Sequence, residues 1–352
     1  MIYLLLISGL FMGWSLGSVD SASAFGTAVA TRVVKYKTAV TIIAIMVILG
    51  AVIGGAGNID SLSNLAKSNE VIASAEDVKE LSKDAIELIR LKSTIKAAII
   101  FVCAALTVFI MTTLKLPVSA NQAITGAIIG WGIFHADYSN PDILWPNVKQ
   151  ILIFASTWIL NPLGAGIISF VLVFLVNRFL SQKLSSLSSY DKIIKFGYLI
   201  AGTLAAFTIG INSSASVTAL YYDATGKGAN LLTNATVAAT IGGIAIAIGA
   251  ITYSKKVMLT VGSGIAEITQ MDGFLVVIAM ALTVFIMKML LKIPVSNSQA
   301  IVGAVMGAGL TRGIRNVNFK KFKSIAIAWV TSPTAAGLLT YLVALCTQKF
   351  FK

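Results

Sequence analysis

The sequence predicts an all-α polytopic membrane protein of two inverted-topology repeats, with broken helices and re-entrant, hairpin-like helix starts. Three observations support this fold class: the composition, the placement of basic residues and an internal duplication. Of the 352 residues, 57% are apolar and 12% are charged, whereas a soluble domain carries about 25% charged residues. About nine apolar stretches are long enough, or nearly long enough, to cross a bilayer as helices, which excludes a β-barrel of short alternating strands.

The basic residues predict the orientation in the membrane. With the N-terminus outside, five basic segments fall on the inner side, as the positive-inside rule requires; they lie at residues 32–37, 115, 178–195, 255–256 and 312–323. We therefore expect a multi-pass protein of the cell (inner) membrane with both termini outside. The net charge of +13 is then explained without a nucleic-acid partner.

The internal duplication consists of three motif pairs in the same order. Residues 17–23 read GSVDSAS, residues 117–126 read PVSANQAITG and residues 158–162 read WILNP. Their copies are GINSSAS at 210–216, PVSNSQAIVG at 294–303 and WVTSP at 329–333. On the expected topology one half enters from outside and the other from inside, so the repeats are inverted, a recurring design of secondary transporters. A duplication that only enlarged a helical bundle is the alternative.

These motifs divide the chain. The first repeat spans residues 1–180 and contains an extramembrane amphipathic insertion at 58–96. A cytoplasmic linker follows at 181–195, and the second repeat spans 196–352.

The PVS motifs match a capping box, in which a serine hydroxyl and a glutamine side chain satisfy backbone donors at a helix start. A helix that starts at membrane depth directs unpaired N–H groups and a partial positive charge at its surroundings, which suits an anion. A plain cap is the alternative for either copy alone. Two copies in inverted halves favour a binding site, because unpaired donors in hydrocarbon are tolerated only where they line a cavity or are buried in protein.

The serine-rich motifs predict helix breaks that could hold a cation through carbonyl and hydroxyl oxygens. Asp20 is the acidic residue that falls within a clear membrane span, and such a carboxylate is a functional-site candidate, with a buried N-cap as the alternative. Its counterpart is Ser213. Asn161-Pro162 and Ser332-Pro333 have the form of helix starts and predict further breaks.

No enzyme is expected, because the chain has one histidine and no polar catalytic cluster. Cys103 and Cys346 lie in apolar runs without a partner spacing, so neither a disulfide framework nor a metal site is indicated.

The motifs at residues 17–27 and in the two PVS blocks resemble those of the inorganic phosphate transporter (PiT) family, including its sulfate permease branch, over nearly the whole chain. The family pattern is Gly-Ala-Asn-Asp-x-Ala-Asn near the start of each half and Pro-Val-Ser-Thr-Thr/Ser-His-Ala-Ile-x-Gly in each hairpin. The resemblance implies that the hairpin starts grip the anion, and that the Asn-Asp positions, here Val19-Asp20 and Asn212-Ser213, bind the coupling cation or the anion.

The chain departs from the family pattern at these positions. One Asp and one Asn remain of the expected four, Asp20 and Asn212, so a complete family sodium site is not expected. The loss of acidic positions and the absence of a long central hydrophilic domain are similar to the sulfate permease branch.

We therefore expect a secondary-active symporter that imports a tetrahedral inorganic oxyanion by alternating access, with sulfate slightly favoured over phosphate and with H⁺ or Na⁺ as the driving ion. The expected substrate-binding residues are Asp20, Ser119, Ala120, Asn121, Ser213, Ser296, Asn297 and Ser298. The expected coupling-ion residues are Asp20, Asn212, Ser23 and Ser216.

Two other functions stay open, a Na⁺- or H⁺-coupled phosphate transporter and a passive anion channel. The expected partners are the anion and the lipid bilayer, and a homodimer is left open. No cofactor is expected, and Na⁺ near Asp20 and Asn212 is the one metal ion considered.

Overall fold

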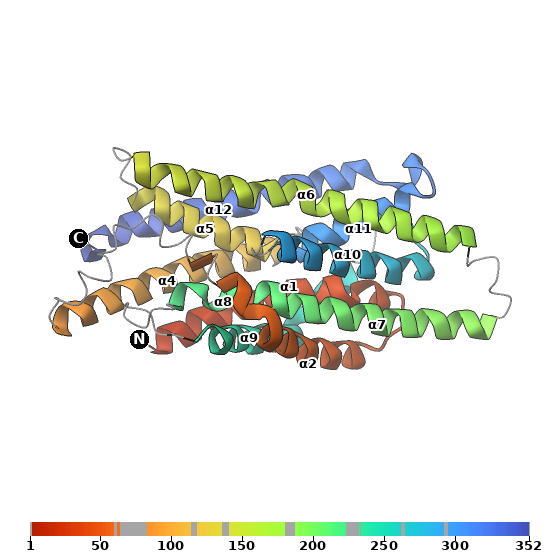
Figure 1. The fold of residues 1–352 in the computed structure, drawn as a ribbon, viewed down its shortest axis with the longest axis horizontal. Coiled ribbons are helices and arrows are strands. Elements are labelled where there is room, and N and C mark those ends of the chain that lie inside the picture. Colours follow the sequence, from red (N-terminus) through yellow and green to blue (C-terminus); the bar gives the residue numbers. More distant parts are fainter. Residues whose placement is uncertain are drawn as a thin grey trace.

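The computed structural model describes residues 2–59, 62–63, 83–113, 118–135, 141–179, 187–222, 232, 234–261, 265–291 and 295–351. In these residues the chain is helical, with two isolated β-bridges and no sheet. The helices, labelled in Figure 1 where there is room, are α1 (Ile2–Ala30), α2 (Tyr36–Gly54), η1 (Gly55–Asn58), α4 (Lys83–Thr113), α5 (Ala120–His135), α6 (Pro141–Phe179), α7 (Leu187–Ser213), α8 (Ala215–Thr218), η4 (Ala219–Tyr221), α9 (Ala235–Val261), α10 (Gln270–Leu291), α11 (Asn297–Leu310), η5 (Ile314–Asn316) and α12 (Phe319–Phe351). The predicted all-α class is confirmed.

Seven helical segments in the described residues are long and apolar enough to cross a membrane: Tyr36–Gly57, Glu87–Thr113, Ile151–Phe179, Tyr190–Tyr221, Ala235–Leu259, Gln270–Leu290 and Phe319–Lys349. α1 has 29 residues and contains the serine motif with Asp20. α5 and α11 have only 16 and 14 residues, whereas a span needs about 20. These two short helices start inside the bundle, as the hairpin motifs predict (Figure 1).

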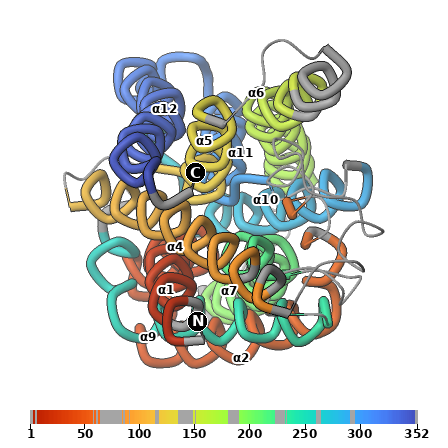
Figure 2. Tube along the Cα trace, turned by 90° about the vertical axis from the view of Figure 1, so that its left-hand side faces the viewer, coloured from red at the N-terminus to blue at the C-terminus, as the bar shows by residue number. Residues whose placement is uncertain are grey.

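The long helices run roughly along one axis and form three groups in the end-on view (Figure 2). α5, α6, α11 and α12 lie on one side, α1, α2, α7 and α9 lie on the other, and α4 and α10 lie between them. The packing follows this arrangement, since α1 contacts α9, α2 contacts α7 and α9, α5 contacts α12, and α6 contacts α11.

Most of these contacts have a counterpart in the other half of the chain. α5 packs on α12 as α11 packs on α6, α4 packs on α1 as α10 packs on α7, and α4 packs on α5 as α10 packs on α11. In Figure 1, α6 and α12 run in opposite directions along the bundle, and so do α5 and α11.

Glycines allow the short helices to approach the long ones closely. A Cβ at Gly126 or Gly130 of α5 would overlap the backbone of Pro333 or Gly337 of α12. The same holds on the other side, where Gly303 and Gly307 of α11 meet Pro162 and Gly166 of α6. Each pair of glycines is four residues apart, the small-xxx-small spacing that brings membrane helices into backbone contact.

The breaks predicted at Asn161-Pro162 and Ser332-Pro333 are wrong, because α6 and α12 continue through both prolines. Proline removes one helical hydrogen bond and often breaks a helix. In membrane helices it is tolerated where neighbouring helices pack on the affected turn. Here the glycines of α5 and α11 occupy that position, so each proline lies at a helix contact instead of a helix start.

The predicted segment boundaries fall partly outside the described residues. Of the insertion at 58–96, residues 60, 61 and 64–82 lie outside them, and residues 83–96 form the first turns of α4, which continues to Thr113. Of the linker at 181–195, residues 181–186 lie outside them, and residues 187–195 begin α7. The repeat boundaries therefore remain predictions.

Candidate functional site

The second serine motif interrupts a helix, and the first does not. α7 ends at Ser213 and α8 begins at Ala215, and Ser214 between them keeps helical dihedral angles (φ −60°, ψ −36°), so the break is a one-residue interruption of the hydrogen-bond pattern. α1 runs without interruption through residues 17–23, so the predicted break there is wrong. The hydroxyls of Ser18 and Ser21 donate to backbone carbonyls three and four residues earlier, which lets them stay in a helix.

The predicted helix caps are present at both PVS motifs. Ser119 Oγ accepts a hydrogen bond from Gln122 N at 3.3 Å, and Ser296 Oγ accepts one from Gln299 N at 3.1 Å. The second half of each capping box is not formed. Both glutamine side chains are buried, and neither their oxygen nor their nitrogen has a hydrogen-bond partner within the described residues.

The two hairpin tips, residues 118–122 and 295–299, contact each other through reciprocal hydrogen bonds. Asn121 Nδ2 donates to Val295 O at 2.7 Å, and Ser298 Oγ donates to Val118 O at 3.0 Å. Asn121 and Ser298 occupy equivalent positions in the two motifs. The tips therefore meet at the centre of the duplicated arrangement, each holding the backbone that precedes the helix of the other.

Asp20 joins α1 to the second tip and to the break in α7. Its Oδ2 accepts hydrogen bonds from Asn297 Nδ2 at 2.8 Å and from Ser213 Oγ at 3.0 Å. Asn297 Nδ2 also lies 3.1 Å from Ser213 Oγ. Asp20 is 3% exposed, so the carboxylate is shielded from solvent in this conformation.

Residues beside the break also form hydrogen bonds with both hairpin tips. Asn212 Nδ2 donates to Val295 O at 2.6 Å, and Asn212 Oδ1 accepts from Val295 N at 2.9 Å, so this side chain pairs with both polar backbone atoms of one residue. Ser216 Oγ donates to Asn121 Oδ1 at 2.8 Å.

The structure brings six of the predicted site residues into one buried hydrogen-bond network: Asp20, Asn121, Asn212, Ser213, Ser216 and Asn297. Ser296 and Ser298 lie beside it, with their hydroxyl oxygens 3.2 Å apart, and Ser119 caps α5. Ala120 is buried and can offer only its backbone. Ser23 is buried in α1, and no described hydrogen bond joins it to the network.

The chemistry of this network is that of a neutral donor set around one carboxylate. In the described residues, Asp20 forms no ion pair with a basic side chain. The amide and hydroxyl donors are all engaged with protein oxygens, so the cluster is closed. An anion could enter only by replacing these internal acceptors with its own oxygens, and a cation only by taking oxygens that now receive donors.

Sequence reasoning missed a second buried acid. Asp272, in the first turn of α10, is 0% exposed and forms an ion pair with Arg312 at 2.5 Å. Its Oδ2 also accepts from Thr269 N at 3.1 Å. The pattern Thr-x-x-Asp at a helix start could have identified it, so the statement that Asp20 alone lies within a membrane span is corrected.

Three further polar residues were missed for different reasons. Gln122 and Gln299 were interpreted as capping residues. Only the serine half of each capping box forms, so both glutamine side chains lack a hydrogen-bond partner within the described residues. Asn161 was interpreted as a helix start, yet it donates to Ser296 O at 2.7 Å and its own oxygen has no partner within the described residues.

The chain is similar to known proteins over nearly its whole length. The sequence model of the phosphate transporter family matches residues 16–340. A predicted phosphate permease of Thermococcus kodakarensis is 27% identical over 96% of this chain and 95% of its own length. The sulfate permease CysP of Bacillus subtilis is 27% identical over 96% of this chain and 86% of its own length.

A solved structure shows the same fold. A sodium-dependent phosphate transporter superposes with a TM-score of 0.74 at 21% identity, and the match covers 99% of this chain and 98% of that one. Together with the apolar helices, these matches identify a multi-pass membrane protein of the transporter class. The family model spans nearly the whole chain, from the serine motif in α1 to α12, and the chain therefore belongs to the phosphate transporter family.

Proposed function

We propose that this protein is a secondary-active symporter that imports a tetrahedral inorganic oxyanion by alternating access, coupled to H⁺ or Na⁺. One observation carries the proposal: two capped helix starts contact each other, and the second of them, together with the helix break, holds a buried carboxylate, Asp20. Helix N-termini favour anions because their backbone N–H groups are unpaired and their dipole is positive. Transporters of this class place such broken helices around the substrate near the middle of the bilayer.

The proposal includes two inverted repeats. The exchange of helix contacts between the halves and the opposite directions of α6 and α12 support it (Figure 1). In such folds one repeat moves against the other around a fixed site. The reciprocal bonds between the tips would then open and close with each cycle, because each tip belongs to a different half.

Opening of the tips would make donors available to the anion. The side chains of Asn121 and Ser298 now donate to backbone carbonyls of the facing tip. The side chain of Asn212 donates to the carbonyl of Val295 in the second tip. Once these carbonyls move away, the same N–H and O–H groups can donate to the oxygens of sulfate or phosphate. The remaining predicted residues, Ser119, Ala120, Ser213, Ser296 and Asn297, would complete the donor set through side chains or backbone N–H groups.

Asp20 is the proposed coupling residue. A carboxylate and a divalent anion repel each other in a site shielded from water, so binding of the anion favours uptake of H⁺ or Na⁺ at Asp20. For Na⁺, the fitting groups are the carboxylate and the hydroxyl of Ser213, which already lie 3.0 Å apart. Asn212 and Ser216 lie in the same network, whereas Ser23 is the least supported of the proposed coupling residues.

Sulfate is proposed over phosphate by a small margin. Sulfate has only acceptor oxygens, and the serine, asparagine and backbone groups can all donate to it. The second half carries Ser213 where the first carries Asp20, so the site has one carboxylate to repel a fully ionised anion.

Phosphate is the second candidate, and Asp20 favours it. Phosphate keeps a proton at neutral pH, and a carboxylate can accept that hydrogen bond. The names of the relatives include both phosphate and sulfate permeases.

The test is uptake of radiolabelled sulfate and phosphate into the same proteoliposomes under imposed Na⁺ or pH gradients. We expect accumulation above equilibrium, with sulfate taken up in preference and excess sulfate inhibiting phosphate. Phosphate uptake that sulfate does not inhibit would assign phosphate instead. Anion flux that no gradient can drive above equilibrium would indicate a passive channel.

A further inference from the structure

The two short helices that begin at the hairpin tips lie in the same register beside two long helices. Gly303 of α11 approaches the backbone of Pro162 in α6, and Gly126 of α5 approaches the backbone of Pro333 in α12. In both places a Cβ on the glycine would overlap the carbonyl oxygen of the proline. The two contacts are therefore equivalent, and so are the residues that precede the prolines.

These preceding residues, Asn161 and Ser332, form different contacts. Asn161 Nδ2 donates a hydrogen bond to Ser296 O at 2.7 Å, which joins α6 to the carbonyl at the start of α11. Ser332 is also buried, but its hydroxyl has no hydrogen-bond partner among the described residues. Of the described donors, Ala123 N of α5 alone bonds to the equivalent carbonyl, Ser119 O. In the described part of the chain, α6 thus anchors the second tip, and α12 forms no such bond to the first.

The other hydrogen bonds of the tips show the same difference. Asn212 of α7 bonds to both polar backbone atoms of Val295 in the second tip, and Asn297 of that tip donates to the carboxylate in α1. Within the described residues, the first tip has one hydrogen bond to an element other than the second tip, from Ser216 Oγ of α8 to Asn121 Oδ1. Each hydrogen bond adds to the free energy needed to displace a segment. The first tip is therefore displaced more easily than the second.

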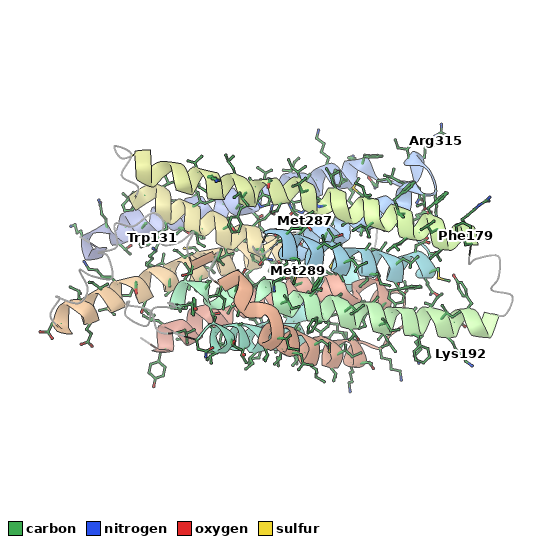
Figure 3. The ribbon with its side chains drawn as sticks, in the orientation of Figure 1. Trp131, Phe179, Lys192, Met287, Met289 and Arg315 are labelled. Atoms are coloured by element: carbon green, nitrogen blue, oxygen red, sulfur yellow. The ribbon has the colours of Figure 1, made fainter. Side chains whose placement is uncertain are left out.

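We propose that Asn161 is a positioning residue that anchors the second tip to α6, and that the first tip, without an anchor at Ser332, is the one that moves to open the anion site. This inference rests on the symport function proposed above and deepens it, because it states which of two equivalent hairpins gives access to the site. α5 runs from the first tip toward the end of the bundle where Trp131 and the C-terminus lie, so the site opens toward that end (Figures 1 and 3).

An anchored second tip also affects binding of the anion. Its backbone N–H groups and Asn297 stay in place while the first tip leaves and returns. The anion then needs to order one tip and not two, and a site that is partly ordered in advance binds its ligand more tightly.

Thiol labelling of the purified protein tests the proposal without transport. Ala123 and Ala300 are equivalent residues in the first turns of α5 and α11, and both are fully buried. In a background without Cys103 and Cys346, Ala123→Cys and Ala300→Cys report how often each tip opens to a water-soluble maleimide. We expect A123C to react about tenfold faster than A300C, which corresponds to ~1.4 kcal/mol in the free energy of opening.

Two substitutions exchange the anchoring residue between the long helices. Asn161→Ser gives α6 the residue that α12 has, and it should raise the labelling rate of A300C to about that of A123C. Ser332→Asn gives α12 the amide that α6 has, and it should lower the rate of A123C. Each substitution should leave the rate of the other cysteine unchanged, whereas a general loss of stability would raise both rates.

Three results would overturn the proposal: equal labelling of A123C and A300C in the unmodified background, no change of the A300C rate in N161S, or an equal rise of both rates in N161S. An unchanged A123C rate in S332N would overturn the assignment of Ser332 as the missing anchor. Should N161S not fold, Asn161→Leu removes the same N–H donor at a similar side-chain volume, and the same outcomes apply to it.

Anion uptake provides a second readout. N161S should raise the KM for the anion several-fold, because binding must then order both tips. S332N should lower the maximal rate, because the first tip opens less often. An unchanged KM in N161S would overturn the positioning role of Asn161. A protein that carries neither sulfate nor phosphate would refute the proposed function, while the labelling rates would still decide which tip opens.

Discussion

The carboxylate of Asp20 links α1, the break after α7 and the second hairpin tip. Its charge can be removed without removing its hydrogen bonds if an amide replaces the carboxylate. Asp20→Asn keeps an oxygen that can accept from Ser213 and Asn297. We expect D20N to lose gradient-driven accumulation and to retain exchange of internal for external anion, because binding persists while the charge that responds to H⁺ or Na⁺ is gone. Accumulation and counterflow assays in proteoliposomes measure the two activities separately.

Asp272→Asn is the matched control for D20N, because Asp272 is equally buried but lies at the Arg312 ion pair. Removing one partner of a buried pair costs up to about 3–5 kcal/mol, less here since Arg312 is 37% exposed and can turn to solvent. D272N should therefore melt earlier and remain coupled. An unchanged Na⁺ and pH dependence of uptake in D20N would remove Asp20 from the coupling mechanism.

The two glutamine side chains without hydrogen-bond partners yield a prediction about the stability of the folded protein. A buried polar group without a partner costs about 1–3 kcal/mol, and Gln122 and Gln299 each leave two such atoms. Gln299→Met preserves the side-chain length and removes both, so its Tm should rise. Gln270→Met, at an exposed position at the start of α10, should change Tm little. A lower Tm for Q299M would show that the amide is satisfied in the folded protein.

Residue-level prediction from sequence worked where the chemistry is local. The caps at Ser119 and Ser296 depend on neighbouring residues, and both were predicted. The glutamine side chains and Asn161 depend on which helix packs against them, and no spacing in the sequence records that. Asp20 and Asn297 were both expected at the substrate site, but the hydrogen bond between them, 277 residues apart in the sequence, was not predicted.

At the scale of elements, the short helices are positioned by glycine contacts. Gly303→Ala in α11 would place a methyl group on the carbonyl of Pro162, and overpacking of this kind costs about 1–3 kcal/mol. We expect a lower Tm and reduced anion uptake, because α11 begins at the second tip. Gly57→Ala is the control, since a Cβ there has no neighbour within 4 Å. Equal melting of the two variants would contradict the close approach of α11 to α6.

Three predicted helix breaks are absent, two at prolines and one at the serine motif of α1. Proline in α6 and α12 and the serine cluster in α1 are helix-breaking signals in water. In a bundle without water, a broken backbone must find new partners, so the unbroken helix is favoured unless a partner exists. At Ser214 the backbone keeps such a partner, because Ser214 O accepts a hydrogen bond from Val217 N at 3.2 Å. Packing, which sequence does not state, decides between the two outcomes.

At the scale of the whole molecule, the duplication predicted which helices correspond, and the contact pairs agree with that correspondence. The duplication does not predict how the side chains of equivalent segments pair. Asp20 and Ser213 hold equivalent positions in the two motifs yet form a hydrogen bond with each other, so their pairing is asymmetric. A repeat pattern reveals equivalence but not the side-chain pairing that arises where equivalent segments meet.

Orientation is the remaining whole-molecule prediction, and it follows from charge. Arg315 and Lys192 lie at the same end of the bundle (Figure 3), as expected if the basic segments around them share the inner side. α12 connects that end to the C-terminus, with Lys320 near its start and Lys349 near its end. In a background without Cys103 and Cys346, a membrane-impermeant thiol reagent added to intact cells should label Lys349→Cys and should not label Lys320→Cys. Permeabilised cells should show labelling of both, which establishes that each cysteine is reactive. The opposite pattern in intact cells would place both termini inside and would reverse the direction assigned to every helix, because the alternation of the spans fixes all of them once α12 is known.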